Sequence, residues 1–282
     1  MTIVAVTGAS GFVGRHVLPA LSKRGVDIVA HARAPSVERQ AAGPLRRVGF
    51  DLAHVADAFD RLGRPDIVIH LAWGGLPNYL SRRHVEVELP AQLGFLRGLA
   101  DAGLTRLVVA GTCFEYGMQS GCLHEEMAPQ AVTPYGAAKN ELRRGLESLS
   151  ARAPLDLRWL RLFYLYGDGQ SPSSLYSLFR AAVARGAPVF DMSPGDQQRD
   201  FMKAEEAGAA IAEVALAPRA PRVINICSGV PVTVRDLVES WRSEMGADIK
   251  LNPGVLPYPT YEPFAFWGEN RRLAALLGNP SK

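Results

Sequence analysis

The chain of 282 residues has little cysteine, no long apolar run and no strong excess of either charge. Three cysteines with no C-x-x-C pair predict free thiols in a reducing compartment rather than a disulfide framework. A formal net charge of +3 is too small to indicate nucleic acid or a membrane surface as a partner. No apolar stretch approaches membrane-spanning length, and the N-terminus lacks the charged region of a signal peptide. The six histidines show no metal-ligand spacing, so we expect no metal site. The free thiols and the missing signal peptide predict a cytoplasmic protein.

The chain begins with an apolar run, a glycine-rich turn and a helical pattern, in that order. Residues 3–6 predict a buried strand, and apolar residues at positions 13, 17 and 21 recur on one helical face. In such a turn one glycine allows the tight bend, one lets the backbone approach a pyrophosphate, and one lets the helix pack on the strand. The helix N-terminus then offers unpaired N–H groups and a positive dipole end to the phosphates. The predicted cofactor-binding residues of this turn are Gly8, Ser10, Gly11, Phe12, Val13 and Gly14.

Two features of this segment depart from the usual dinucleotide pattern. The glycine spacing is G-x-x-G-x-x-G rather than G-x-G-x-x-G, so a purely structural turn is the alternative interpretation. Pro19 removes one hydrogen bond of the helix, and we expect a tolerated local kink there. The order of strand, turn and helix is nevertheless the context that a dinucleotide site requires.

The end of the second predicted strand, residues 26–33, bears on the identity of the cofactor. An NAD site usually has an acidic residue here to bind the ribose hydroxyls, whereas an arginine accommodates the extra phosphate of NADP. The chain has Ala32 at this place and Arg33 beside it, and a guanidinium can bind a phosphate bidentately. We therefore predict NADPH/NADP as the cofactor, with NAD less favoured and a solvated loop position for Arg33 as the alternative. Asp51 and Leu52, at the end of a strand predicted over 48–52, are further cofactor-binding candidates, although Asp51 could instead cap the next helix.

Strands and helices alternate along the first part of the chain. Further buried strands are predicted over residues 66–72, 104–110 and 157–165, with helices over 86–102 and from 134 onward. This alternation predicts an α/β fold with a Rossmann-type doubly wound parallel sheet, whose catalytic residues lie at the carboxyl ends of the strands. Beyond residue 165 the alternation weakens. We expect helices over 171–185, 204–216 and 234–245, a strand over 223–226 and a polar turn over 196–201.

Tyr135 and Lys139 lie four residues apart on a predicted helix, so they share one face. A phenol has an unperturbed pKa near ~10, and a nearby ammonium group lowers that pKa because it stabilises the phenolate. Thr112, at the end of the preceding strand, has a hydroxyl that can hold a carbonyl oxygen beside the phenol. Together these groups can deliver a proton to an alkoxide as a hydride arrives from a nicotinamide. Alone, Y-x-x-x-K is also typical of a surface helix, and its position after the glycine turn and the parallel strands makes it specific.

Several stretches of the chain match the motifs of one family. They are TGASGFVG, HLA, the strand end from Thr112 to Tyr116-Gly117, YGAAK, RLFYLYG, QQRDF and NICSG. On these stretches the chain resembles an extended short-chain dehydrogenase/reductase of the sugar-nucleotide epimerase/dehydratase/reductase group. The resemblance implies a Rossmann domain, a smaller α/β C-terminal domain for a nucleoside-diphosphate sugar, and often a homodimer. We expect residues 1–165 and about 201–228 to form the NADP-binding domain, and about 166–200 and 229–282 to form the nucleotide-sugar-binding domain.

The family's site residues carry over onto the positions that match its motifs. The resemblance implies a catalytic triad of Thr112, Tyr135 and Lys139, of which Tyr135 and Lys139 also touch the cofactor. Further cofactor-binding residues are expected at Leu71, Ala72 and Trp73. Substrate-binding residues are expected at Trp73, Tyr79, Thr112, Cys113, Phe114, Tyr164, Gln170 and Arg199. Arg199 falls where the family contacts the nucleotide phosphates, and Trp73 either lines the sugar pocket or packs under its loop.

Departures from the family pattern reduce the number of reactions that we expect this chain to catalyse. Dehydratases of the group have Asp and Glu after the first triad residue, where this chain has Cys113 and Phe114, so dehydration is not expected. Synthases with a cysteine acid–base place it where Phe114 stands, and we expect Cys113 to be a small packed residue. C4 epimerases usually carry the acidic residue after the second strand, which this chain lacks. Glu88 and Tyr164 stand where the family usually has Asn, which leaves the details of proton delivery open.

Simple hydride transfer is the reaction that remains. The stretches HLAWGGLPNY and GTCFEYG resemble the 4-ketoreductase branch, similar to dTDP-4-dehydro-6-deoxyglucose reductase and CDP-abequose-type synthases. We therefore predict NADPH-dependent reduction of the C4 ketone of a nucleoside-diphosphate 4-keto-6-deoxyhexose, for deoxysugars of bacterial surface polysaccharides such as O-antigen. The alternatives are a sugar-nucleotide epimerase with resident NAD and a non-catalytic dinucleotide-binding sensor.

Overall fold

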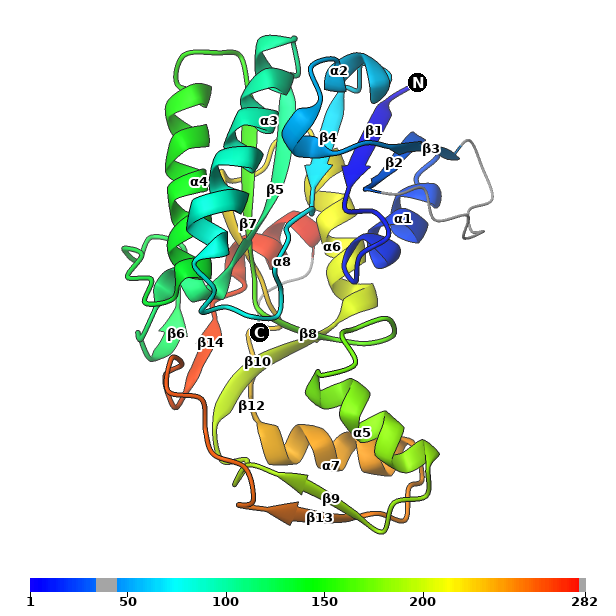
Figure 1. Ribbon diagram of the computed structural model, residues 1–282, viewed down its shortest axis with the longest axis vertical. Helices are drawn as coiled ribbons and strands as arrows, with labels where there is room; N and C mark the ends of the chain where they lie inside the picture. Colours follow the sequence, from blue (N-terminus) through cyan, green and yellow to red (C-terminus); the bar gives the residue numbers. More distant parts are fainter. Residues whose placement is uncertain (34–44, 279–282) are drawn as a thin grey trace.

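The computed structural model describes residues 1–33 and 45–278, which form a larger and a smaller part (Figure 1). The strands are β1 Ile3–Thr7, β2 Asp27–Ala32, β3 Leu45–Gly49, β4 Ile67–His70, β5 Arg106–Thr112, β6 Gly121–Leu123, β7 Asp156–Leu162, β8 Tyr164–Tyr166, β9 Val189–Met192, β10 Gln198–Lys203, β11 Val223–Ile226, β12 Pro231–Thr233, β13 Lys250–Pro253 and β14 Phe266–Gly268. The α-helices are α1 Gly14–Ser22, α2 Ala58–Arg61, α3 Leu89–Asp101, α4 Pro134–Ser150, α5 Leu175–Ala184, α6 Ala204–Leu216, α7 Val234–Glu244 and α8 Arg271–Leu277. Shorter helical turns are η1 Leu52–His54, η2 His84–Glu88 and η3 Cys113–Tyr116.

The larger part is built on one parallel sheet. Its strand order is β11-β7-β5-β4-β1-β2-β3, and every neighbouring pair is parallel. The order reverses between β1 and β4, where a doubly wound sheet opens a crevice at the carboxyl ends of its strands. The turn after β1 and the ends of β4 and β5 therefore meet at one edge, and the predicted Rossmann-type α/β fold is confirmed.

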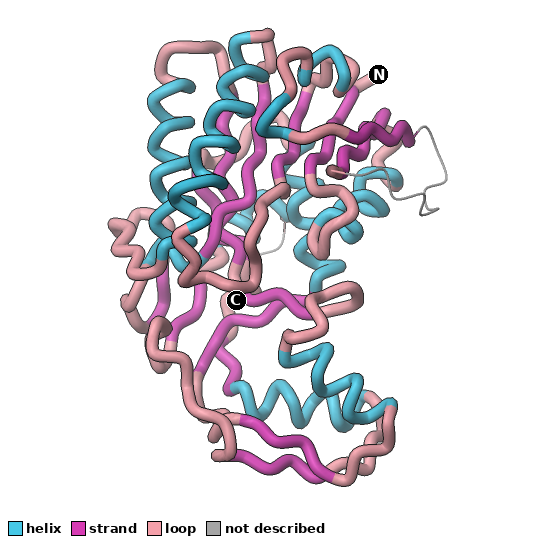
Figure 2. Tube along the Cα trace, in the orientation of Figure 1, coloured by secondary structure: helices cyan, strands magenta, loops and turns pink. Residues whose placement is uncertain are grey.

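Helices cover both faces of this sheet, which lies between them in Figure 2. Alternate strand residues point to opposite faces. Val4 and Val6 join a buried cluster with α1 and α6, whereas Ala5 joins a second cluster with α3 and α4. Helix α1 continues through Pro19 to Ser22. No helix in the described ranges is long and apolar enough to cross a membrane.

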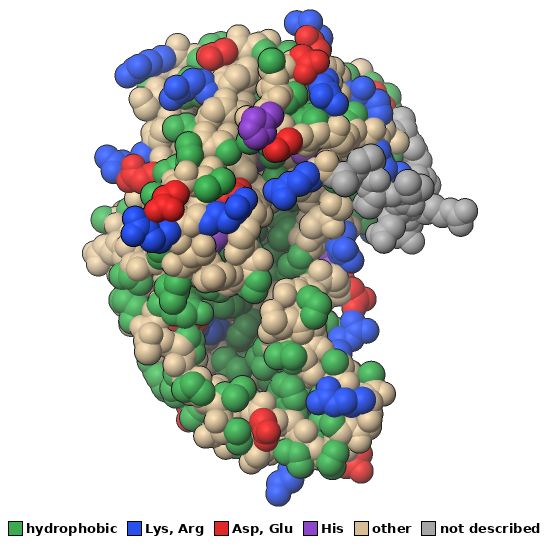
Figure 3. Space-filling view, viewed as in Figure 1, with side chains coloured by type: hydrophobic (Ala, Val, Ile, Leu, Met, Phe, Trp, Pro, Cys, Tyr) green, Lys and Arg blue, Asp and Glu red, His purple; other side chains and the backbone are tan. Residues whose placement is uncertain are grey.

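The smaller part contains short sheets beside α5 and α7. Strands β12, β10 and β8 form one sheet, β13 pairs with β9, and β14 pairs in parallel with β6 from the first half of the chain. Its core is aromatic, with Phe179, Phe190 and Trp241 buried together. Hydrophobic side chains gather in the hollow between the two parts (Figure 3).

Several predicted elements are confirmed and others are corrected. The helix over 204–216 and the strand over 223–226 have the predicted bounds. The predicted polar turn over 196–201 is wrong, because residues 198–203 form strand β10. The strand predicted over 48–52 lies earlier, at β3, and residues 52–54 form η1. The predicted domain boundaries stay a prediction. Helix α8 lies in the range predicted for the nucleotide-sugar-binding domain, but it packs against α6 and β11 of the larger part.

Candidate active site

The turn after β1 is compact because its glycines leave room for neighbouring backbone. Gly8 has a φ of 70°, and a Cβ there would lie 2.8 Å from the Ala72 backbone nitrogen. The Gly11 N–H donates to the Gly8 carbonyl oxygen at 3.0 Å, and helix α1 then begins at Gly14. No side chain in the described part of the chain caps this helix start, and Ser10 is exposed beside it. The turn therefore fits a pyrophosphate, as predicted for a dinucleotide cofactor.

Arg33 and Asp51 lie at the edge formed by the ends of β2 and β3. The Asp51 carboxylate accepts the Ala53 N–H at 3.1 Å and caps η1, which is the capping role left open above. That hydrogen bond, one with His54 and the charge of Arg33 together lower the pKa of Asp51. The exposed Arg33 side chain is therefore close enough to act on this carboxylate. Contacts of Arg33, Asp51 and Leu52 with a cofactor stay predictions.

The end of β4 links the glycine turn to the reactive side chains. The Leu71 N–H donates to the Thr7 carbonyl oxygen at 3.1 Å, which places Ala72 against the glycine turn. The next residue, Trp73, lies under Lys139, whose Nζ is 4.0 Å from the centroid of the indole ring. The Trp73 Nε1 donates to Nδ1 of His84 at 3.0 Å. The indole is therefore held beneath its loop and also borders the reactive groups.

The structure brings Thr112, Tyr135 and Lys139 together, and all three are buried. Thr112 ends β5, whereas Tyr135 and Lys139 lie one turn apart on α4. The helix start is fixed because the Thr133 hydroxyl oxygen accepts the Gly136 N–H at 3.1 Å. The Lys139 Nζ donates to the Ala110 carbonyl oxygen at 2.8 Å and lies 6.0 Å from the centroid of the Tyr135 ring.

Burial changes the proton affinities of both titratable members of this triad. Burial raises the pKa of Tyr135 above its ordinary value, with Tyr79 and Cys113 acting in the same direction and a hydrogen bond with Thr112 opposing them. Burial lowers the pKa of Lys139 to about 7, against the opposing charges of Glu115 and Glu88. The net direction for Tyr135 is opposite to that expected from the Tyr–Lys spacing, because desolvation is the largest influence on this phenol. Tyr135 is therefore a neutral phenol that can donate a proton.

Aromatic rings form a wall beside Tyr135. The Tyr79 ring centroid lies 5.5 Å from that of Tyr135 and 4.6 Å from that of Phe114. Tyr164 and Tyr261 extend the wall, with centroids 6.4 Å and 6.2 Å from that of Phe114. The predicted substrate residues Tyr79, Phe114 and Tyr164 thus lie together, in a wall whose faces can pack against the C–H surface of a sugar.

The other predicted substrate residues lie around this wall. Cys113 is buried, and burial raises the pKa of its thiol, so it is a packed neutral group as expected. The Gln170 amide donates to the Leu165 carbonyl oxygen at 2.9 Å, and its own oxygen has no partner within the described ranges.

Arg199 lies in a different setting from the one that phosphate contact suggests. Its Nε and terminal nitrogen donate to the Glu262 carboxylate at 3.2 and 2.9 Å, and a third nitrogen donates to the Phe264 carbonyl oxygen at 2.9 Å. The guanidinium therefore holds the tail segment of the chain in place. Binding of a nucleotide phosphate by Arg199 stays a prediction.

Sequence reasoning missed three residues of the site: His84, Glu115 and Tyr261. The pattern T-x-x-E from Thr112 to Glu115 is a capping box, which is present in the structure and could have drawn attention to this carboxylate. His84 and Tyr261 carry no local signal, because their places depend on contacts with distant elements.

Comparisons with known proteins agree with this fold. The profile of the NAD dependent epimerase/dehydratase family matches residues 4–227. The dTDP-6-deoxy-L-talose 4-dehydrogenase (NAD(+)) of Aggregatibacter actinomycetemcomitans is 28% identical over 269 residues, covering 94% of this chain and 98% of its own. The dTDP-6-deoxy-L-talose 4-dehydrogenase (NAD(P)(+)) of Kitasatospora kifunensis is 30% identical over 267 residues, covering 90% of this chain and 82% of its own.

A solved structure of high similarity is MoeE5 in complex with UDP-glucuronic acid and NAD. It superposes with a TM-score of 0.83 at 29% identity, over 99% of this chain and 93% of its own. The chain therefore belongs to the NAD dependent epimerase/dehydratase family, which confirms its resemblance to the extended short-chain dehydrogenases/reductases.

Proposed function

We propose that the protein catalyses the NADPH-dependent reduction of the C4 ketone of a nucleoside-diphosphate 4-keto-6-deoxyhexose. The observation that carries this proposal is the pair of residues after Thr112, a buried thiol at Cys113 and an aromatic ring at Phe114. Neither can act as the acid and base of a dehydration, whereas Thr112, Tyr135 and Lys139 support hydride and proton transfer. A C4 dehydrogenase and a C4 ketoreductase interconvert the same two sugars, so the two 4-dehydrogenases among the relatives support this reaction class.

The chain's own residues supply the proton and hold the substrate oxygen. Tyr135 is neutral because burial raises the pKa of its phenol, so its hydroxyl can protonate the oxygen at C4. The Lys139 ammonium then stabilises the phenolate that is left. The Thr112 hydroxyl, which hydrogen-bonds with Tyr135, orients the same oxygen. The aromatic wall of Tyr79 and Phe114 excludes water from this exchange and packs on the sugar ring.

NADPH, when bound, supplies the hydride. The glycine turn holds its pyrophosphate, and Arg33 is the residue that would bind the 2′-phosphate that distinguishes NADPH from NADH. We assign residues 1–165 and about 201–228 to cofactor binding, and about 166–200 and the segment from 229 up to α8 to the sugar nucleotide. A homodimer in the cytoplasm completes the proposal, and the molar mass in solution tests the dimer.

The test is oxidation of NADPH by the purified protein, followed by nicotinamide absorbance. The substrates are dTDP-, CDP- and GDP-linked 4-keto-6-deoxyhexoses, each made in place by its own dehydratase. We expect turnover with one of them, loss of that turnover in Tyr135→Phe, and a product whose C4 configuration NMR then defines. Binding of NADPH without turnover of any of the three would reject the proposal.

A second candidate is NAD-dependent epimerisation of a nucleotide sugar, which the similarity to the NAD-bound MoeE5 complex favours. An epimerase must keep its NAD through oxidation and re-reduction of one sugar. Nicotinamide released by denaturing the purified protein would therefore support the epimerase. A cofactor-free preparation that consumes added NADPH would support the reductase.

A further inference from the structure

A buried carboxylate lies directly behind the reactive side chains. Glu115 belongs to η3, the short turn after Thr112, and its side chain is fully buried. We propose that Glu115 is a positioning residue that fixes Thr112 through its backbone and places a negative charge close to Lys139. The inference rests on the proposed function only in that Lys139 must be charged for turnover.

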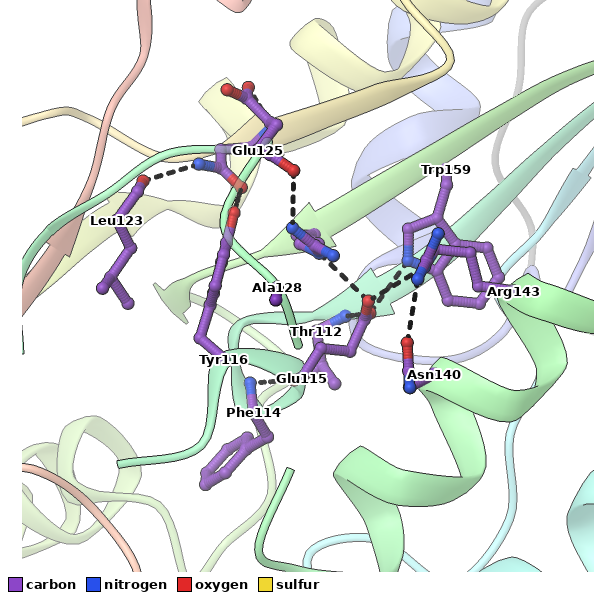
Figure 4. Close-up of polar contacts among 12 residues, drawn as sticks. Thr112, Phe114, Glu115, Tyr116, Leu123, Glu125, Ala128, Asn140, Arg143 and Trp159 are labelled. Carbon is purple, nitrogen blue, oxygen red and sulfur yellow. Dashed lines mark hydrogen bonds and ion pairs between the residues drawn. The ribbon is translucent and has the colours of Figure 1, made fainter. Parts of the chain in front are cut away.

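The Glu115 carboxylate accepts hydrogen bonds from donors on several elements (Figure 4). Its Oε1 accepts the Thr112 N–H at 2.9 Å and the Trp159 Nε1 at 2.8 Å. Its Oε2 accepts the Arg161 Nε at 3.0 Å and lies 3.8 Å from the Arg143 Nε. Gly111 leaves room for the Glu115 carboxylate, because a Cβ at Gly111 would lie 2.6 Å from Oε1.

This geometry fixes the triad residue at the end of β5. The Thr112 backbone is bonded to Glu115 on one side, while its hydroxyl oxygen accepts the Phe114 N–H at 3.3 Å on the other. The Thr112 side chain also takes part in a capping box with the Glu115 backbone, so Glu115 contacts both the backbone and the side chain of Thr112. A shift of the carboxylate therefore shifts the hydroxyl that holds the substrate oxygen.

The Glu115 carboxylate also lies close to Lys139. The Lys139 Nζ donates to the Ala110 carbonyl oxygen at 2.8 Å, and the next residue of β5, Gly111, lies against Glu115 Oε1. Arg143, one turn after Lys139 on α4, lies 3.8 Å from Glu115 Oε2.

Among the groups that act on the Lys139 ammonium, Glu115 opposes the effect of burial most strongly, and Glu88 from η2 comes second. Glu88 is itself bound by the Arg83 Nε and terminal nitrogen at 3.2 and 3.1 Å. Glu115 is thus the carboxylate that acts on Lys139 and also touches Thr112.

Other groups that face Lys139 carry no positive charge at neutral pH. His70 faces it from β4, and burial lowers the pKa of this imidazole to about 3. Tyr135 faces it from α4 as a neutral phenol, and the Trp73 ring lies 4.0 Å from the ammonium nitrogen. Arg161 and Arg143 are positively charged and hold the Glu115 carboxylate.

Glu115→Gln tests the inference because it keeps the shape of the side chain and removes its charge. On the alkaline side, kcat falls as Lys139 loses its proton, and we expect this fall to move to lower pH by about one unit. Glu125→Gln is the matched control, since Glu125 is another buried carboxylate whose oxygen accepts the Asn225 N–H at 2.9 Å. We expect this control to leave the alkaline fall in place.

Glu115→Asp separates the two roles. It keeps the charge but shortens the side chain, so the alkaline fall should stay near its wild-type pH while the plateau of kcat drops about tenfold or more. This conservative variant also keeps a partner for Arg161, so it tests the positioning of Thr112 even if Glu115→Gln does not fold. A wild-type plateau in Glu115→Asp would overturn that part of the inference.

Direct titration of Lys139 separates this inference from the proposed reaction. NMR of isotope-labelled lysine, with Lys139→Met to assign the signal, reports its protonation without any turnover. A lower titration midpoint in Glu115→Gln is the expected result, and it would hold even if no 4-keto sugar were a substrate. An unchanged midpoint would overturn the role of Glu115 whatever the enzyme reduces.

Discussion

Replacing Lys139 with methionine should change how the free energy of unfolding depends on pH and should abolish turnover. Burial lowers the pKa of Lys139 from 10.5 to about 7 in the folded protein. Between these two values the unfolded chain holds a proton that the folded chain lacks. The free energy of unfolding of the wild type therefore rises with pH in this window, by up to about 1.4 kcal/mol per unit. Below it both states are protonated, and the full penalty of the buried charge, about 5 kcal/mol at most, is present.

Methionine at position 139 removes this titration, so the variant should be more stable than the wild type near neutral pH and lose that advantage as the pH rises. We expect the difference in the free energy of unfolding to shrink by about 2 to 3 kcal/mol between pH 7 and pH 9. Urea unfolding of both proteins across this range measures it, with turnover of the variant lost at every pH. Lys250→Met, which removes an exposed ammonium group, is the control.

A difference that stays constant from pH 7 to pH 9 would refute the reasoning, because it would show that Lys139 does not titrate differently in the folded and unfolded states. A difference that grows with pH would refute the sign of the effect.

Three further predictions concern the proton donor, the cofactor and a buried histidine. Tyr135→Phe should lower turnover by about 10²–10⁴-fold and leave the Kd for NADPH, measured by fluorescence, nearly unchanged, whereas Tyr176→Phe in α5 should keep turnover. Arg33→Asp should raise the Kd for NADPH far more than that for NADH, and equal losses would remove Arg33 from the 2′-phosphate site. The wild type should lose stability as the pH falls from 6.5 toward the lowered pKa of His70, about 3, because the unfolded chain takes up a proton that the folded one refuses. His70→Asn should lose less stability than the wild type, by up to about 1.4 kcal/mol per pH unit. Acid unfolding followed by circular dichroism measures this difference, and an identical loss in both proteins would contradict the prediction.

The features that the sequence predicts well are those with short-range causes. The glycine turn and α1 follow from neighbouring residues, and Tyr135 and Lys139 share a face because helical geometry places them one turn apart. Helix α6 and strand β11 have their predicted bounds because their apolar patterns are continuous. The sheet order then follows from the alternation of strands and helices, so the triad could be expected at one edge.

The features that escaped prediction depend on distant partners. The sequence predicts a polar turn over residues 196–201, yet residues 198–203 form β10, and charged side chains among them pair with later parts of the chain. Arg199 pairs with Glu262, and the Asp200 carboxylate accepts the N–H groups of Ser228 and Gly229 at 2.7 and 2.8 Å. The presence of Arg199 and Asp200 in the sequence indicates neither of these contacts. The pKa of Tyr135 likewise depends on burial by rings that come from several separate segments.

The parallel pairing of β14 with β6 has a consequence for how the protein matures during synthesis. The residues predicted to hold the cofactor all precede β7 in the chain, whereas the wall beside Tyr135 includes Tyr261, and β14 follows only a few residues later. N-terminal units fold first as a chain leaves the ribosome. The glycine turn and helix α4 are therefore synthesised before the last ring of the wall beside Tyr135. Residues 266–277 follow, and they bring β14 to β6 and α8 to α6 and β11, so one segment completes both parts of the fold.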